Sequence, residues 1–235
     1  MSDQQQIVLA IETSGLEGDL AVCTADGSVF ESRIGTDGRR HAQTLVAEAG
    51  ALLEVAGLSP SAIDVVAVSN GPGSFTGLRV GTVFAKTMSW ANNAQLVEVD
   101  SLQTVACAAE PSQPIVTAIS DAQRSEVFVN RYSAPDEFGI RHALDELSIA
   151  SVQELNQQFS TERYGILTGA AVGKFAKQLQ NCAVTEPSVW LPQARWVQTI
   201  GRQLAIQNRL ADIASLEPVY VRRSYAEEKV NSKSD

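Results

Sequence analysis

A glycine-rich stretch over residues 69–81 carries groups that could hold an anion. It reads Ser-Asn-Gly-Pro-Gly-Ser-Phe-Thr-Gly-Leu-Arg-Val-Gly, with an apolar run at 63–68 before it and a helical pattern over 75–91. Backbone N–H groups at a turn between a strand and a helix point outward, and the helix dipole adds partial positive charge. Ser74 and Thr76 could cap the helix or contact a phosphate oxygen. The spacing therefore predicts a strand, a tight turn and a helix that could accept phosphate.

Two familiar nucleotide-binding motifs do not match this turn. A Walker loop ends in Gly-Lys-Ser or Gly-Lys-Thr, whereas Gly77 is followed by Leu-Arg. The dinucleotide fingerprint needs Gly or Ala at its sixth position, counted from Gly71, and Thr76 stands there. Pro72 also removes one N–H from the turn. A tight turn without a ligand therefore remains an equal interpretation.

The helix after this turn has two apolar faces. Small residues recur at every fourth position, Gly77, Gly81 and Ala85, so one stripe carries almost no side chain. Polar residues fill only a narrow arc, and large apolar residues take most of the rest. A helix predicted over residues 41–57 also has a broad apolar arc and few charges. We expect one face of each helix to cover its own sheet and the other to meet a partner helix.

The run Gly-Pro-Gly-Ser-Phe-Thr-Gly-Leu-Arg-Val-Gly, residues 71–81, resembles the signature of the TsaB (YeaZ-type) family. The resemblance extends over nearly the whole chain, including His-Ala-Gln from residue 41 and Pro-Val-Tyr-Val-Arg from residue 218. That family supplies the non-catalytic subunit of the bacterial machinery that makes threonylcarbamoyladenosine in tRNA. The resemblance therefore implies an accessory subunit with no catalytic residues of its own.

The resemblance also implies partners. Helices 41–57 and 75–91 would pair with the same helices of a catalytic homologue, TsaD. With the ATPase TsaE, the pair moves threonylcarbamoyl from an adenylate onto the adenosine beside the anticodon of tRNAs that read codons beginning with A, so tRNA is met through the complex. Alone, the chain would form a homodimer through the same helices. The expected partner-contacting residues are His41, Leu45, Ala49, Leu52, Gly77, Val80, Gly81, Phe84, Ala85 and Met88.

The chain contains an internal repeat. The segment 115–121 echoes 7–13 at an offset of 108 residues, and each copy is followed by a turn and an alternating strand. The pattern βββαβα then occurs twice, which gives an actin-like (ASKHA) α/β fold of two subdomains, as the resemblance also implies. The expected subdomains are residues 1–110, with the two interface helices, and residues 111–235, with the C-terminal tail. Other predicted elements are a helix that Asp100 and Gln103 open with a capping box, a strand at 140–149 and a helix at 193–209.

In actin-like ATPases and kinases a carboxylate in the first hairpin organises Mg²⁺ and phosphates, and Glu12 occupies that place here. Asp121 stands in the repeated hairpin, with Arg124 and Glu126 after it. No cofactor is expected in the isolated chain, and ATP or ADP with Mg²⁺ at a junction with another subunit is left open. The residues that could contact phosphate or nucleotide there are Glu12, Thr13, Ser14, Gly71, Gly73, Ser74, Thr76 and Arg79.

Composition excludes several functions. The net charge of −9 disfavours the chain as the main surface that grips nucleic acid. The two histidines, His41 and His142, do not form a metal-binding pair, so no metal site is expected. No apolar run is long enough to span a membrane, and isolated cysteines are typical of a reducing compartment, so we expect a cytoplasmic protein.

A second function stays open as the alternative. The chain could be a small ATP-dependent phosphotransferase or ATPase that uses Glu12, Asp121 and the glycine-rich turn. Such an enzyme needs two phosphate turns, a general base and an adenine pocket, and the candidate for that pocket, the turn at 168–171, is weak. Binding and turnover of Mg-ATP by the isolated chain would separate the two functions.

Overall fold

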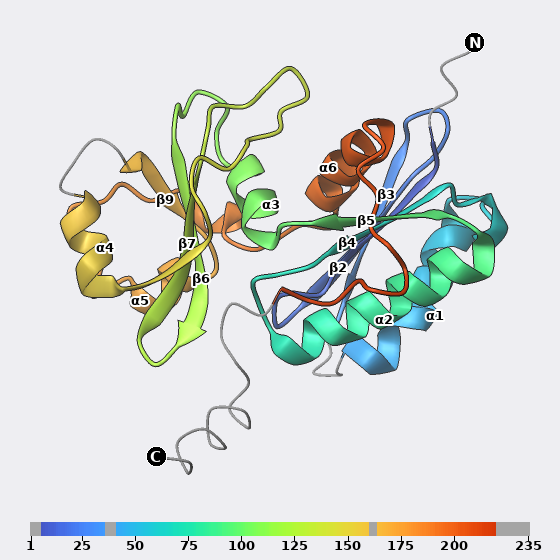
Figure 1. The fold of residues 1–235 in the computed structure, drawn as a ribbon, viewed down its shortest axis with the longest axis horizontal. Coiled ribbons are helices and arrows are strands. Elements are labelled where there is room, and N and C mark those ends of the chain that lie inside the picture. Colours follow the sequence, from blue (N-terminus) through green and yellow to red (C-terminus); the bar gives the residue numbers. More distant parts are fainter. Residues whose placement is uncertain (1–5, 36–40, 160–163, 220–235) are drawn as a thin grey trace.

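The computed structural model describes residues 6–35, 41–159 and 164–219, without the side chains of His41 and Ala42. Two β-sheets lie side by side, each covered by helices on both faces (Figure 1). The strands are β1 (Val8–Glu12), β2 (Gly18–Cys23), β3 (Val29–Ile34), β4 (Val65–Ser69), β5 (Gln95–Val99), β6 (Val116–Gln123), β7 (Glu126–Tyr132), β8 (Ser148–Ser151) and β9 (Ile166–Thr168). The helices are α1 (His41–Val55), α2 (Phe75–Asn92), α3 (Ser101–Cys107), α4 (Val152–Phe159), α5 (Ala171–Phe175) and α6 (Ala194–Ile206), and 3₁₀ turns lie at Pro60–Ala62 and Pro187–Val189.

The first sheet has the strand order β3-β2-β1-β4-β5, with β1 antiparallel to β2 and parallel to β4. Every residue of β1 is buried, because successive side chains enter different cores. Leu9 and Ile11 pack in the cluster that contains residues of α1 and α2, whereas Val8 and Ala10 pack in the cluster that contains residues of α6. Burial on both faces explains why this strand is a continuous apolar run.

The second sheet repeats the first. Its order is β8-β7-β6-β9, with β6 antiparallel to β7 and parallel to β9. Helix α4 lies between the third and fourth strands of this half, as α1 does in the first half, and α5 follows the fourth strand, as α2 does. The βββαβα duplication and the α/β class predicted from the sequence are therefore confirmed.

Two helices pack on the sheet of the other half. Helix α3 follows β5, yet its Leu102 and Ala106 pack in one cluster with Val116 and Tyr132 of the second sheet. Helix α6 follows the second sheet and covers β1, β2, β4 and β5 of the first. The two helices contact each other between the sheets (Figure 1). The segment 111–235 thus includes a helix that belongs to the core of the first sheet, and the boundary at residue 110 stays a prediction.

The strand predicted at 140–149 begins later than expected, as β8 at Ser148, and residues 140–147 are not part of it because Arg141 turns its side chain into the interior. That side chain is 1% exposed, and its guanidinium donates to the carbonyl oxygens of Glu110, Gln113 and Ser133 at 2.7–2.8 Å. The segment is therefore held as a loop, with one bridge from Ala143 to Tyr132 before β8 begins. A buried guanidinium satisfied by carbonyl groups is costly to break, so it fixes this loop against the end of α3.

The start of α3 also differs from its prediction. Asp100 caps the helix by accepting from the Leu102 amide at 2.8 Å, as expected. Gln103 does not complete a capping box, because its side-chain amide donates to the carbonyl oxygen of Arg141 at 2.8 Å. At the chain's end, α6 stops at Ile206 and so is shorter than the predicted 193–209, and the motif residues Tyr220 and Arg222 lie outside the described residues.

Two helical glycines give a matched test of how α6 is seated. A Cβ on Gly201 would lie 2.4 Å from the Cβ of Ala67 in β4, whereas a Cβ on Gly50 in α1 would meet no atom within 4 Å. Both Gly→Ala changes gain about 0.5–1 kcal/mol of helix propensity. We expect Gly50→Ala to raise the free energy of unfolding by about that amount and Gly201→Ala to lower it by about 1–2 kcal/mol through overpacking, measured by urea denaturation. Equal shifts in the same direction would contradict the packing described for α6.

Candidate functional site

The glycine-rich turn lies directly against the turn of the first hairpin. The Ser74 amide donates to the carbonyl oxygen of Ser14 at 2.7 Å, and a Cβ on Gly73 would lie 2.5 Å from that same oxygen. The Gly71 amide donates to the hydroxyl oxygen of Ser101 at 3.1 Å. The strand, turn and helix predicted from the spacing are confirmed. Two of the backbone donors that could have held a phosphate, however, bond within the chain.

Helix α2 begins with a side-chain cap, and its first turns face solvent. The hydroxyl oxygen of Ser74 accepts from the Gly77 amide at 3.3 Å, which satisfies one of the free donors at the helix start. Thr76 and Arg79 are exposed, and the Arg79 guanidinium stacks over the Phe75 ring at 3.9 Å. Of the predicted phosphate contacts, the side chains of Thr76 and Arg79 are the ones that a second molecule could readily reach.

Glu12 is an ionisable group in the interior. Its side chain is 1% exposed, its Oε1 accepts from the Ser14 amide at 2.5 Å, and its Oε2 is buried without a hydrogen-bond partner. Burial raises the pKa of Glu12 from an ordinary 4.5 to about 7, although hydrogen bonds from Ser14 and Ser69 act in the opposite direction. A carboxyl group that is enclosed and about half protonated near pH 7 is poorly suited to organise Mg²⁺ and phosphate, so the predicted role for Glu12 does not fit this site.

Thr13 sets how closely α2 approaches the first sheet. It is fully buried, and its amide donates to the hydroxyl oxygen of Ser69 at 3.3 Å. A Cβ on Gly81 would come within 2.2 Å of the Thr13 Oγ1. Gly81 is therefore needed by the protein's own hairpin, and enlarging it would disturb the fold before it disturbed a partner.

The second hairpin is also occupied by internal contacts. The Asp121 carboxylate accepts from Lys174 of α5 at 2.5 Å and from the Gln123 amide at 2.9 Å. Three consecutive residues of its turn, Gln123, Arg124 and Ser125, adopt left-handed backbone angles. Within the described part of the chain, no three His, Cys, Asp or Glu residues lie close enough together to hold a metal ion.

The structure places most of the predicted partner-contacting residues inside the monomer. On α1 and α2 the side chains that face the first sheet are at most 9% exposed, and they pack with β1, β2 and β4. Val80 and Met88 are half-buried at the edge of this core, and the side chain of His41 lies outside the described residues. The residues that serve this internal packing are Leu45, Ala49, Leu52, Gly77, Gly81, Phe84 and Ala85.

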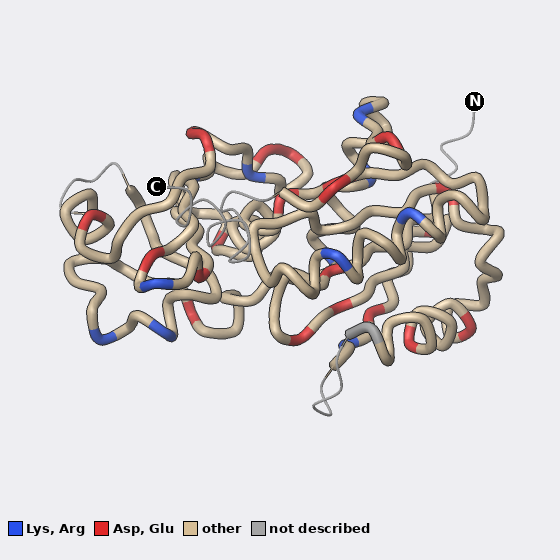
Figure 2. Tube along the Cα trace, turned by 60° about the horizontal axis from the view of Figure 1, so that its bottom comes forward, with Lys and Arg blue, Asp and Glu red and all other residues tan. Residues whose placement is uncertain are grey.

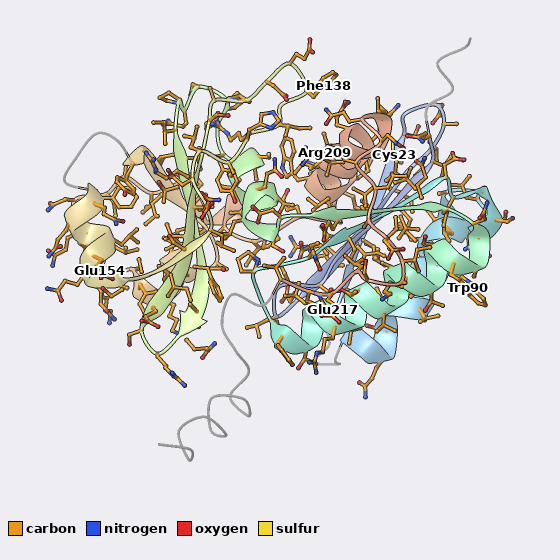
Figure 3. The ribbon with its side chains drawn as sticks, in the orientation of Figure 1. Cys23, Trp90, Phe138, Glu154, Arg209 and Glu217 are labelled. Atoms are coloured by element: carbon orange, nitrogen blue, oxygen red, sulfur yellow. The ribbon has the colours of Figure 1, made fainter. Side chains whose placement is uncertain are left out.

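An exposed apolar strip, most of whose residues differ from the partner contacts predicted from the sequence, runs along the outside of the same two helices. Val46, Val83 and Trp90 are 69%, 64% and 77% exposed, and Trp90 projects from the outer side of α2 (Figure 3). We call these residues the outer strip: Val46, Ala47, Gly50, Ala51 and Val55 of α1 with Val83, Trp90 and Ala91 of α2. The members on α1 are spaced three or four residues apart and those on α2 seven or eight apart, so helical periodicity could have revealed the strip.

The polar arc of α2 faces the C-terminal segment. The Lys86 ammonium donates to the carbonyl oxygens of Ala214 and Leu216 at 3.2 Å, and Thr82 and Ser89 are buried. Thr82, Lys86 and Ser89 therefore face the protein, whereas Thr76, Arg79 and Thr87 of the same helix face solvent. The second apolar face that the sequence predicts is present, but it is the outer strip.

Comparisons with known proteins agree with this fold. Residues 36–216 match the family described as TsaD: tRNA N6-adenosine threonylcarbamoyltransferase. Two relatives are named tRNA threonylcarbamoyladenosine biosynthesis protein TsaB. The Escherichia coli K12 protein is 28% identical over 231 residues, which are 96% of this chain and 99% of the relative, and the Bacillus subtilis protein is 23% identical over 227 residues, 94% and 96%.

The solved structure of YeaZ from Pseudomonas aeruginosa superposes with a TM-score of 0.79 at 22% identity, covering 92% of this chain and 100% of that chain. The likeness extends over both sheets, since so little of either chain is left out. The actin-like (ASKHA) fold class predicted from the sequence is therefore confirmed.

The raised pKa of Glu12 predicts an unusual dependence of stability on pH. The folded chain holds this proton up to about pH 7, whereas the unfolded chain releases it near 4.5. Raising the pH through this window should therefore lower the free energy of unfolding by about 3 kcal/mol. Glu12→Gln has no proton to lose, so we expect it to be more stable than the wild type at pH 8 and to lose that advantage by pH 5, measured by urea denaturation. Glu54→Gln, an exposed control, should follow the wild type. Parallel profiles for Glu12→Gln and the wild type would contradict the prediction.

Proposed function

The chain belongs to the TsaB (YeaZ-type) family and carries a domain of the TsaD family, and we propose that it is a non-catalytic subunit in the synthesis of threonylcarbamoyladenosine in tRNA. The observation that carries this proposal is the outer strip, an apolar surface on two helices that cover the same face of the first sheet. Apolar surface of this extent on a soluble protein is typical of an interaction site. The partner is a TsaD-like catalytic subunit.

The internal hydrogen bonds of the glycine-rich turn favour an accessory role for this chain over a catalytic one. A phosphate between the two turns would need the donors that bond Ser74 to Ser14 and Gly71 to Ser101. It would also need carboxylates free to hold Mg²⁺, but Glu12 is enclosed and Asp121 is paired with Lys174. We therefore derive no phosphoryl-transfer step in this chain and favour the accessory role over the phosphotransferase.

The charge distribution supports indirect contact with tRNA. Lys and Arg residues of the described chain lie at scattered positions, without a continuous basic face (Figure 2). Because phosphate contacts need clustered cations, tRNA is bound mainly by other subunits of the complex. No described helix is both long and apolar enough to cross a membrane. We further propose that a TsaE-like ATPase takes part in the complex and that the protein is cytoplasmic. The isolated chain would form a homodimer.

We propose that any bound nucleotide lies at the interface between this chain and the catalytic subunit. Thr76 and Arg79 stand in the exposed first turns of α2, next to the outer strip. They could contact ATP or ADP held by the partner, which would keep the chemistry on the catalytic subunit. Glu12, Thr13 and Ser14 are buried and take no part in it.

Val83→Glu tests the docking surface without disturbing the core, since Val83 is 64% exposed. Desolvating a carboxylate in an apolar interface should weaken binding to the TsaD-like subunit at least about tenfold. The measurements are copurification with that subunit and formation of the modified nucleoside in a reconstituted reaction with and without this chain. Val184→Glu, at a 46% exposed valine of the second half, is the matched control and should behave as the wild type. Undiminished binding and activity of Val83→Glu would refute the assigned surface.

Calorimetric titration with Mg-ATP separates the two functions. We expect no binding heat from the isolated chain at millimolar nucleotide, because the donors of the glycine-rich turn are already bonded. Low-micromolar binding with turnover by the chain alone would instead establish the phosphotransferase.

A further inference from the structure

A cavity of about 670 Å³ lies between the two halves. Its walls come from the corner between β5 and α3, the loop between β7 and β8, and the last turns of α6 with the residues after them. Phe138 on that loop and Arg209 beyond α6 border it (Figure 3). The outer strip contributes no residue to its lining, so the cavity is a second surface, separate from the one proposed for the catalytic subunit.

One part of the cavity wall is apolar. Phe138 and Val219 belong to it and are 50% and 47% exposed, so a large share of their hydrocarbon surface meets water. Covering such a surface with another apolar segment is favourable because it removes that hydrocarbon from water. The cavity therefore favours an occupant with apolar side chains. The other apolar lining residues are Val99, Ile140, Leu147, Ile200 and Leu204.

Hydrogen bonds lead the chain's own C-terminal segment to this cavity. The Val219 amide donates to the carbonyl oxygen of Asn70 at 2.9 Å. The side-chain amide of Asn70 donates in turn to the carbonyl oxygen of Glu217 at 3.0 Å. Val219 is the last residue that the structure describes, and it lines the cavity. The following residues therefore start at the cavity wall.

The sequence after Val219 complements the cavity. Residues 220–225 read Tyr-Val-Arg-Arg-Ser-Tyr, which places two aromatic rings, a valine and two guanidinium groups within six positions. Six residues in an extended conformation span about 20 Å, so they can reach well along a cavity of this size. Because the segment is part of the same chain, its effective concentration at the cavity is high, and modest contacts suffice to hold it.

Two carboxylates of the lining are placed to receive the arginines. Glu98 stands where the segment enters, since the Asn70 amide that binds the segment also donates to Glu98 Oε2 at 2.6 Å. Glu137 stands on the loop between β7 and β8, and both glutamates are exposed. Asp100 and Asp136 also line the cavity, but they already accept hydrogen bonds from side chains of the second half.

We propose that residues 220–225 dock in this cavity, with their aromatic and aliphatic side chains on the apolar wall and their two arginines paired with Glu98 and Glu137. The docked segment covers Phe138 and links the first half to the loop between β7 and β8. It thereby stabilises the arrangement of the two halves. This inference does not depend on the proposed function, since it makes no use of the outer strip.

Trypsin, which cuts after arginine and lysine, reports docking in the full chain. A synthetic peptide of residues 216–235 gives the intrinsic cleavage rate at each site. We expect cleavage after Arg222 and Arg223 to be at least about tenfold slower in the protein than in the peptide, because a docked segment must leave the cavity before it can be cut. Cleavage after Lys233, beyond the docked residues, should proceed at the peptide's rate and is the internal control.

Substitutions in the two parts of the wall test the assigned contacts. The double variant Glu98→Gln, Glu137→Gln keeps side-chain size while removing two charges, and Phe138→Ala removes apolar contact surface. Each should reduce the protection of the two arginine sites at least about threefold. The controls are Glu54→Gln, an exposed carboxylate of α1, and Leu144→Ala, a 47% exposed residue of the same loop that is not part of the lining. Both controls should keep the wild-type protection.

Three results would overturn the proposal. Cleavage after Arg222 and Arg223 at the peptide's rate would mean that the segment is not docked. Protection that survives both the double glutamate variant and Phe138→Ala would place the segment outside this cavity. Protection that increases with protein concentration would mean that the segment docks on a second copy of the chain instead of on its own.

Discussion

The hydrogen bond from the Ser74 amide to the Ser14 carbonyl joins the glycine-rich turn to the turn of the first hairpin. Gly73 makes the contact attainable, because any side chain there would overlap the backbone of Ser14. The Ser74 amide is thus already bonded within the chain, and Glu12 is buried nearby with its Oε2 lacking a hydrogen-bond partner. The cost of that buried group is tolerable because a raised pKa keeps much of it neutral near pH 7.

The same contact sets the position of α2 on the first sheet. That position determines which face of α2 is exposed to a partner. Thr13 lies against Gly81, so the helix approaches the sheet closely and buries its small-residue stripe in the monomer. What remains outside is the outer strip, in which Val83 and Trp90 are largely exposed. The bonded turns and the exposed outer strip are therefore two results of one packing arrangement, and the proposed accessory role rests on both.

Much of the fold was predictable, because hydrophobic periodicity and the residue preferences of turns and helix caps depend on local sequence. The apolar strands, the cap at Asp100 and the 108-residue repeat all appear where the sequence places them. The errors came from long-range contacts. Arg141 has the pattern of a strand residue, but its carbonyl partners are brought to it by the end of α3. Hydrophobic periodicity alone also cannot say which of the two apolar faces of a helix packs on the sheet. The polar side of α2 could not be placed either, because Lys86 binds a segment more than 120 residues later in the chain. The candidate site was found from its motif, but its closure depends on Ser14, which the motif does not contain.

The exchange of α3 and α6 between the sheets has a consequence for how the protein is made. All five strands of the first sheet precede residue 100, but one of its two faces is covered by a helix that begins at Ala194. During translation that apolar face, with Val8, Ala10 and Val97, stays uncovered while the entire second sheet is synthesised. The core of the first sheet is therefore complete only after α6 has been synthesised and has docked. A gene fragment that ends between the two halves would yield an incomplete core rather than a smaller functional protein.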